Sequence, residues 1–258
     1  MHGISKMHIE NQYLLLPVFI FLISCTLCTL HYFIARQVYH DKSANILAFA
    51  SGNGNIGYFG IPVAMVLFPP ELVGVYMVMV IGIMLYETTL GYYITTKGDF
   101  STREAIRNMT RLPMLHGALI GLFLSLMGIP LPDFMEGFFT SLRGAYSTLG
   151  MMVVGIGLAG VTSFRLDWKF TGMAFAVKFI GWPLMVGALI LLDQQVMHLF
   201  SPQVHAAAHL LSFMPLAVNS VIFATLLEAE PEKMATAVFL STVFALFYVP
   251  AMVSWLIL

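Results

Sequence analysis

The chain has 258 residues, of which 59% are hydrophobic and only 10% are charged, with a net charge of −1 and a mean hydropathy of +0.86. Soluble domains average about 45–50% apolar and about 25% charged residues, so this composition excludes a soluble globular protein and predicts a polytopic membrane protein. The near-zero net charge and the lack of basic runs also argue against nucleic acid as a partner.

Eight apolar segments are long enough to cross a bilayer as helices, since a spanning helix needs about 20 mostly apolar residues. These runs do not alternate as the strands of a membrane barrel do. In chain order the predicted spans are 13–35, 44–68, 72–96, 112–131, 137–162, 170–192, 204–227 and 233–257. The predicted fold class is therefore an all-α polytopic membrane protein with eight transmembrane helices.

Basic residues occur almost only in alternate connections between these spans. They are Arg36, Lys42, Lys97, Arg103, Arg107, Arg111, Arg165, Lys169 and Lys233. Of the remaining basic residues, Lys6 precedes the first span. By the positive-inside rule, the basic loops are cytoplasmic and both termini lie outside, in a plasma membrane that would be the inner membrane of a bacterium.

Two of the spans contain residues that a helix interior avoids. The second span carries "GNGNIGYFGIP", in which Pro62 lacks the N–H that would bond to the carbonyl of Tyr58, so a break or kink is expected there. The seventh span carries "SFMPLAVN", with Pro215 and Asn219 in the middle of the apolar run. Non-helical backbone at membrane depth is tolerated only where it is buried in protein or lines a wet cavity.

The surroundings of the two interrupted spans are also alike. Each is followed by a proline–glutamate helix start, "FPPELVG" or "AEPEKMA", and each is preceded by a span that contains a proline. Spans one to three thus resemble spans six to eight at an odd offset of five, which predicts an inverted-topology repeat. The predicted organisation is an N-terminal repeat (1–96) that lacks its first two helices, a cytoplasmic loop (97–111) and a C-terminal five-helix repeat (112–258).

The interruptions supply candidate groups for binding an anion. Side-chain amides can donate to a carboxylate, the freed N–H groups of a half-helix favour negative charge, and glycines give a flexible backbone. The candidate substrate-binding residues are Asn53, Asn55, Gly60, Pro62, Pro215 and Asn219. The alternative is that small residues merely let helices pack closely, which explains the glycines but not the asparagines.

Two of the ionisable residues within the predicted spans, Glu87 and Lys178, are candidates for coupling or charge balance. Glu87 is about ten residues from either end of span three, where a carboxylate is expensive and indicates function. It could carry a coupling proton, or it could be neutral or bonded to Thr88, Thr89 or a neighbouring amide. Lys178 could balance an anion, pair with Glu87, or extend toward the cytoplasmic surface; the last is slightly favoured.

His205 and His209 have the i,i+4 spacing of metal ligands, but no acid accompanies them as in HExxH. A solvated helix end is the favoured interpretation. The sequence therefore predicts no metal or organic cofactor.

The interrupted spans resemble a known family. Asn55, four residues and then Gly60-Ile61-Pro62 resemble the fourth-helix signature of the auxin efflux carrier family, which includes bacterial organic-anion permeases. "FMPLAVN" is similar to the ninth helix of that family, "AVKFIGWP" with Lys178 in a basic position to the eighth, and "PEKMATAVFLSTVFALFYVP" to the tenth. The resemblance extends from about residue 13 to 257.

The resemblance implies a ten-helix secondary transporter with two inverted five-helix repeats. In this family two proline-broken helices cross near the midplane and frame the substrate site, which places Asn55 with Pro62 in one half-site and Pro215 with Asn219 in the other. The chain begins at the position of the third helix, in agreement with the repeat count.

These observations predict a secondary transporter of a small organic anion, such as a dicarboxylate, that works by alternating access, with one half rocking against the other around a midplane site. The coupling ion, proton or sodium, and a homodimeric state are left open. A truncated, non-transporting remnant or interaction partner is the alternative. Since the chain has no HExxH, GxSxG or paired intramembrane Asp, we expect it not to be an enzyme.

Overall fold

The computed structural model describes residues 11–96 and 166–257, together with scattered positions between 107 and 152. The loop predicted at 97–111 and the spans predicted at 112–131 and 137–162 fall outside the two continuously described segments. No strand occurs in either of those segments.

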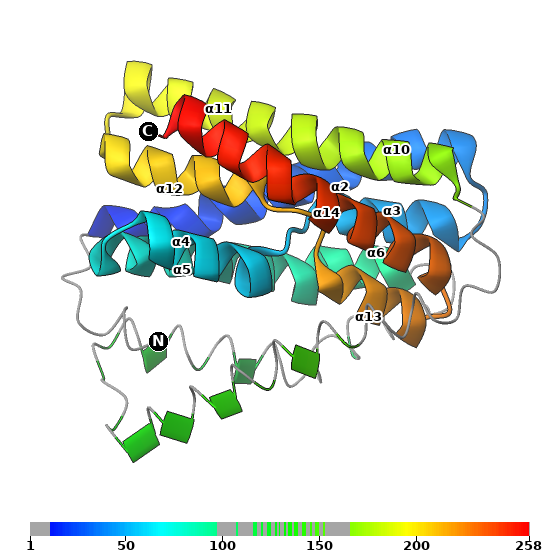
Figure 1. Cartoon of the computed structure of the whole chain (residues 1–258), viewed down its shortest axis with the longest axis horizontal. Helices are drawn as coiled ribbons and strands as arrows, with labels where there is room; N and C mark the ends of the chain where they lie inside the picture. Colours follow the sequence, from blue (N-terminus) through cyan, green and yellow to red (C-terminus); the bar gives the residue numbers. More distant parts are fainter. Residues whose placement is uncertain are drawn as a thin grey trace.

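Both described segments are helical (Figure 1). Several of their helices change to a wider π-helical turn partway along. The first segment contains η1 (Asn11–Leu14), α2 (Leu15–Val38), α3 (Lys42–Ser51), η2 (Ile56–Gly60), α4 (Ile61–Leu67), α5 (Pro70–Tyr86), η3 (Glu87–Gly91) and α6 (Tyr92–Thr96). The second contains α10 (Trp168–Ala176), η4 (Val177–Gly181), α11 (Trp182–Leu192), η5 (Asp193–Met197), α12 (Pro202–Phe213), α13 (Val218–Leu226) and α14 (Pro231–Leu256).

Four continuous helices in the described segments are long and apolar enough to cross a membrane. They are Gln12–Val38, Pro70–Thr96, Trp168–Met197 and Pro231–Leu256, which correspond to the first, third, sixth and eighth predicted spans. The pair α12 and α13, bent by 45°, makes a fifth if it is counted as one span. The predicted second span is divided into short pieces, α3 and α4, with the π-turn η2 between them, and does not form one long helix.

The first break lies earlier than Pro62. Helix α3 ends at Ser51, and the chain from Gly52 to Asn55 is non-helical before η2 begins. A break or kink was expected at Pro62: the break itself does not fall there, and Pro62 is exposed in the first turn of α4, directly after the π-turn η2. It is tolerated there because it directly follows the wider π-turn η2, which relieves the clash that its ring would make with a carbonyl of a regular α-helix.

The second break runs from Met214 to Ala217 and contains Pro215, as expected. Met214 and Ala217 have extended backbone angles, with ψ of 146° and 136°. In Figure 1 the chain from α3 to α4 runs from right to left, whereas the chain from α12 to α13 runs from left to right. The two breaks meet, because the backbone N–H of Asn55 donates to the carbonyl oxygen of Pro215 at 2.8 Å. The broken helices therefore cross in opposite directions at their non-helical segments.

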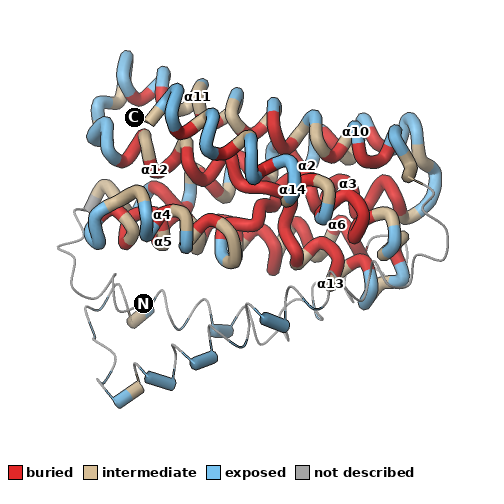
Figure 2. Tube along the Cα trace, in the orientation of Figure 1, coloured by how far each residue is buried: buried red, intermediate tan, exposed pale blue. Residues whose placement is uncertain are grey.

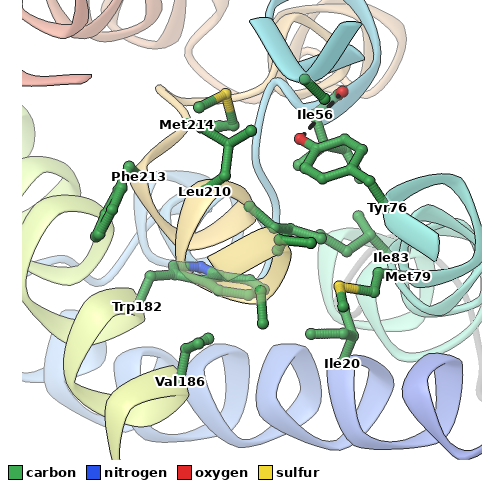
Figure 3. Packing of buried hydrophobic residues seen from close by; sticks show 14 of the residues in the cluster. Ile20, Ile56, Tyr76, Met79, Ile83, Trp182, Val186, Leu210, Phe213 and Met214 are labelled. Atoms are coloured by element: carbon green, nitrogen blue, oxygen red, sulfur yellow. Dashed lines mark hydrogen bonds between the residues drawn. The ribbon is translucent and has the colours of Figure 1, made fainter. Parts of the chain in front are cut away.

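Hydrophobic clusters lie on either side of this crossing, and each contains residues of both described segments. One cluster joins α2, α4 and α5 to α11, α12 and α14, with Ile20, Met79, Trp182 and Leu210 among its members (Figure 3). Another joins α2 and α3 to α10, α13 and α14, with Phe49 and Val221 buried in it. Figure 2 shows the buried residues concentrated around the crossing. Residues 11–96 and 166–257 thus pack together as one unit.

A polar network also joins the two segments where α3, α10 and α14 begin. The Tyr39 hydroxyl donates to the Asp167 carboxylate at 3.1 and 3.2 Å, and Lys233 Nζ lies 3.9 Å from the same carboxylate. Lys42 Nζ donates to the carbonyl of Leu227 at 3.0 Å. Burial, together with the bond to Asp167, raises the pKa of Tyr39 to about 12, so its hydroxyl remains a donor across the physiological range.

Close approach of α2 and α5 requires Gly82. A Cβ at Gly82 would meet the carbonyl oxygen of Pro17 and lie 3.1 Å from Cβ of Ile20. We expect Gly82→Ala to lower the free energy of unfolding by about 1–3 kcal/mol through overpacking. Gly187→Ala is the matched control, because nothing lies within 4 Å of a Cβ at that helical position; it should be neutral or stabilise by up to about 1 kcal/mol. Thermal unfolding of both variants in detergent tests this, and equal melting temperatures would contradict close α2–α5 packing.

Candidate functional site

A cavity of about 410 Å³ opens at the crossing, within the usual size range of small-molecule sites. Both breaks and the middle of α5 contribute to its wall. Its polar side chains include Asn53, Asn55, Glu87 and Asn219, and its apolar wall includes Ile56, Val80, Ile83, Met84 and Val218. The structure thus brings together residues more than 160 positions apart in the sequence.

The carboxylate of Glu87 is the centre of the polar part of the wall. Asn53 Nδ2 donates to Glu87 Oε1, and Asn219 Nδ2 lies 2.8 Å from Oε1 and 3.1 Å from Oε2. Glu87 is only 3% exposed. The hydroxyls of Thr88 and Thr89 donate instead to backbone carbonyls of their own helix. Of the partners considered from the sequence, the neighbouring amides are therefore the ones that bind Glu87.

The starts of two half-helices also face this cavity. Residues 55–57, where η2 begins, and 217–219, where α13 begins, form part of its wall. The first backbone N–H groups of a helix lack intrahelical acceptors and carry partial positive charge. The cavity therefore favours a negative group, and Glu87 is one such group already present in the wall.

Asn55 has a double structural role at the first break. Its backbone N–H reaches Pro215, and its Oδ1 accepts from the backbone N–H of Phe59 at 3.3 Å, as a helix cap does. Its Nδ2 is buried and finds no hydrogen-bond partner within the described part of the chain. Asn55 can therefore offer a donor to a bound molecule without giving up its cap.

On the other side of the first break, the carbonyl groups at the end of α3 accept hydrogen bonds from side chains of the protein. The last carbonyls of α3 accept from the Tyr86 hydroxyl, at Phe49 O (2.9 Å), and from Trp182 Nε1, at Ser51 O (2.8 Å). Buried carbonyls at a helix end need such partners. These contacts allow a helix to end inside the protein without exposing its carbonyls to water.

Lys178 is buried beside the first break and does not extend to the surface. Its side chain is 0% exposed, and Nζ lies 4.4 Å from the centroid of the Trp182 ring. The slightly favoured prediction of an extended lysine was wrong, because Trp182, one turn later, offers an aromatic face and Gly54 leaves space for the ammonium. Within the described residues Lys178 makes no ion pair with Glu87, and Nζ has no hydrogen-bond partner.

Three of the predicted substrate-binding residues lie near the cavity but are not part of its wall. They are Gly60, Pro62 and Pro215. Pro62 is exposed on α4, and Pro215 contributes its carbonyl to the crossing. A Cβ at Gly60 would meet the Tyr76 hydroxyl and lie 3.1 Å from Met214, so Gly60 serves close packing beside the second break. That Gly60 and Pro62 bind substrate has no support in the described geometry.

Sequence reasoning missed the roles of Gly54, Tyr86 and Trp182, although an aromatic donor near a broken helix is a usable signal. It was also wrong about His205. His205 is buried at 8% exposure, and its Nε2 lies 2.8 Å from Asp193 Oδ2. Asp193 also accepts from backbone N–H groups in the following turn, so the pair closes the connection between η5 and α12. Among the described residues no cluster of three or more potential ligands could hold a metal.

Comparison with known proteins places this geometry in a family. Residues 99–253, more than half of the chain, match the family described as "Membrane transport protein". The chain belongs to this family, that of the auxin efflux carriers. The family match contains the second break. An uncharacterized transporter of Methanocaldococcus jannaschii is 25% identical over 254 residues, which cover 96% of this chain and 80% of that protein. As a member of the membrane transport family, the chain is an integral membrane protein and a transporter.

Proposed function

We propose that this member of the membrane transport family carries a small organic anion by alternating access at the crossing. The observation that supports this most strongly is that both breaks, two half-helix starts and three amide side chains meet at one cavity. Asn55 and Asn219 are the proposed substrate-binding residues, with Asn53 in support. In the proposed orientation the basic loops are cytoplasmic and both termini lie outside.

The distribution of polar groups in the cavity wall favours one class of organic anion over another. Polar side chains lie around Glu87, whereas Val80, Ile83 and Met84 form an apolar wall. A second carboxylate placed against that wall would lose its hydration without gaining a partner. An anion with one carboxylate and an apolar body therefore fits this cavity better than a dicarboxylate does.

Glu87 is the proposed coupling residue. When it is ionised, it occupies the amides and half-helix starts that a substrate carboxylate also needs, and the two negative charges repel each other in a medium of low dielectric. Protonation of Glu87 removes this repulsion and provides an O–H donor to the substrate. One proton would then accompany each anion; sodium is the other coupling ion that we consider.

The hydrophobic clusters that both described segments share limit which parts of the protein can move during alternating access. If residues 11–96 rocked against residues 166–257, the Asn55–Pro215 hydrogen bond and both clusters would be disrupted. We therefore propose that these segments move together as one body with the cavity between them. In alternating access, the cavity then opens to one side of the membrane and afterwards to the other, while the crossing itself stays closed.

Replacing Asn55 tests the site. Asn55→Ala removes the free Nδ2 donor, and a hydrogen bond to a charged group is worth about 1.5–3 kcal/mol, so affinity should fall by about 10- to 150-fold. The measurement is uptake of radiolabelled benzoate and malate by proteoliposomes that contain the purified chain. Asn45→Ala is the control: the amide of Asn45 bonds to the carbonyl of Ile94, away from the cavity, so the KM should be unchanged. An unchanged KM in Asn55→Ala would exclude this residue from the site.

Replacing Glu87 tests coupling. Glu87→Gln mimics the protonated carboxyl in size and hydrogen bonding and carries no titratable proton. Transport by the wild type should accelerate when a proton gradient is imposed in the direction of uptake, whereas Glu87→Gln should transport at a rate independent of that gradient. Retention of the gradient response by Glu87→Gln would rule out Glu87 as the proton carrier.

A further inference from the structure

An ammonium group lies directly behind the cavity wall. A Cβ at Gly54 would lie 2.6 Å from Lys178 Nζ, so the ammonium occupies the space that any larger residue at position 54 would need. Gly54 itself lines the cavity. The amino group of Lys178 is therefore separated from the cavity by one stretch of glycine backbone.

Two features favour an ammonium group at the position of Lys178 Nζ, beside Gly54. The Trp182 ring lies 4.4 Å from Nζ, a distance at which an aromatic face attracts a cation. Trp182 is itself fixed, because it is fully buried and its Nε1 donates to Ser51 O, the last residue of α3. The carboxyl end of a helix carries partial negative charge, which further favours an ammonium beside it.

The Lys178 amino group lies beside Gly54, and the Glu87 carboxyl group is bonded to the preceding residue, Asn53. Gly54 N–H donates to Asn53 Oδ1 at 2.7 Å, and Asn53 Nδ2 donates to Glu87. Both charged side chains are almost completely buried, so little water screens them. A fully buried ammonium with no hydrogen-bond partner in the described residues is costly unless a negative charge offsets it.

We propose that Lys178, seated behind Gly54 by Trp182, is the residue that sets the charge selectivity of the cavity. Its charge offsets that of Glu87 when the site is empty, and it attracts the substrate carboxylate once Glu87 is protonated. The inference rests on the proposed function, since it assumes that the cavity binds an organic anion. Lys178 acts through the field at the cavity and does not contact the substrate.

Binding of a charged and a neutral probe of the same shape separates this role from packing. The probes are benzoate and benzamide, and the readout is the ratio of their affinities for the purified full chain at a pH low enough to populate protonated Glu87. We expect the wild type to prefer benzoate, Lys178→Met to lose roughly tenfold or more of that preference, and Lys178→Arg to keep most of it. Lys169→Met, an exposed lysine on α10, is the matched control and should leave the ratio unchanged.

The affinity ratio does not depend on how much of a preparation is folded, so it remains informative if Lys178→Met is unstable. If that variant cannot be purified, Gly54→Ala replaces it, because the added methyl would displace the ammonium and should lower the preference in the same direction. An unchanged ratio in Lys178→Met, or in Gly54→Ala in its place, would overturn the role of Lys178 while leaving the proposed site intact. Failure of the wild type to bind either probe would count against the proposed cavity as well.

Discussion

A main-chain hydrogen bond from the amide of Asn55 to the carbonyl of Pro215 fixes the point at which the two broken helices cross. Because both breaks meet at this bond, the starts of η2 and α13 face the same cavity. The bond also lies between two hydrophobic clusters, each built from both described segments. The positions of Asn53, Asn55 and Asn219 in the candidate site follow from this crossing.

The charges around the crossing match the ends of the half-helices. The carboxylate of Glu87 lies with two asparagine amides near the helix starts, where backbone N–H groups are unsatisfied. The amino group of Lys178 lies beside Gly54, in the break that follows α3, and Tyr86 and Trp182 donate to the last carbonyls of that helix. Buried polar backbone is thereby stabilised in a protein that cannot rely on water at membrane depth.

Much of this arrangement could be predicted from residues alone. Long apolar runs identify the continuous helices, and glycine, asparagine and proline within such runs identify the breaks. The break falls at Gly52–Asn55 and not at Pro62, because the glycines and asparagines end α3 first and Pro62 follows the π-turn η2. The interpretations of Lys178 and His205 failed because each depends on how the chain folds back, which brings Gly54 to Lys178 and Asp193, across a turn, to His205. Local spacing carries no information about such contacts. The inverted repeat stays a prediction, supported by two breaks that cross in opposite directions.

Replacing Asn55 by proline tests the central claim most directly. Asn55 has φ of −75°, which proline can adopt, so Asn55→Pro and Asn55→Ala both lose the side-chain amide but only the proline also loses the backbone N–H. Without a bond to Pro215, the rigid proline would make the protein equally stable or more stable by about 0.4–1 kcal/mol. We predict instead that Asn55→Pro unfolds more easily than Asn55→Ala by about 1–3 kcal/mol, because the buried carbonyl of Pro215 loses its donor. A melting temperature for Asn55→Pro equal to or above that of Asn55→Ala would contradict the account.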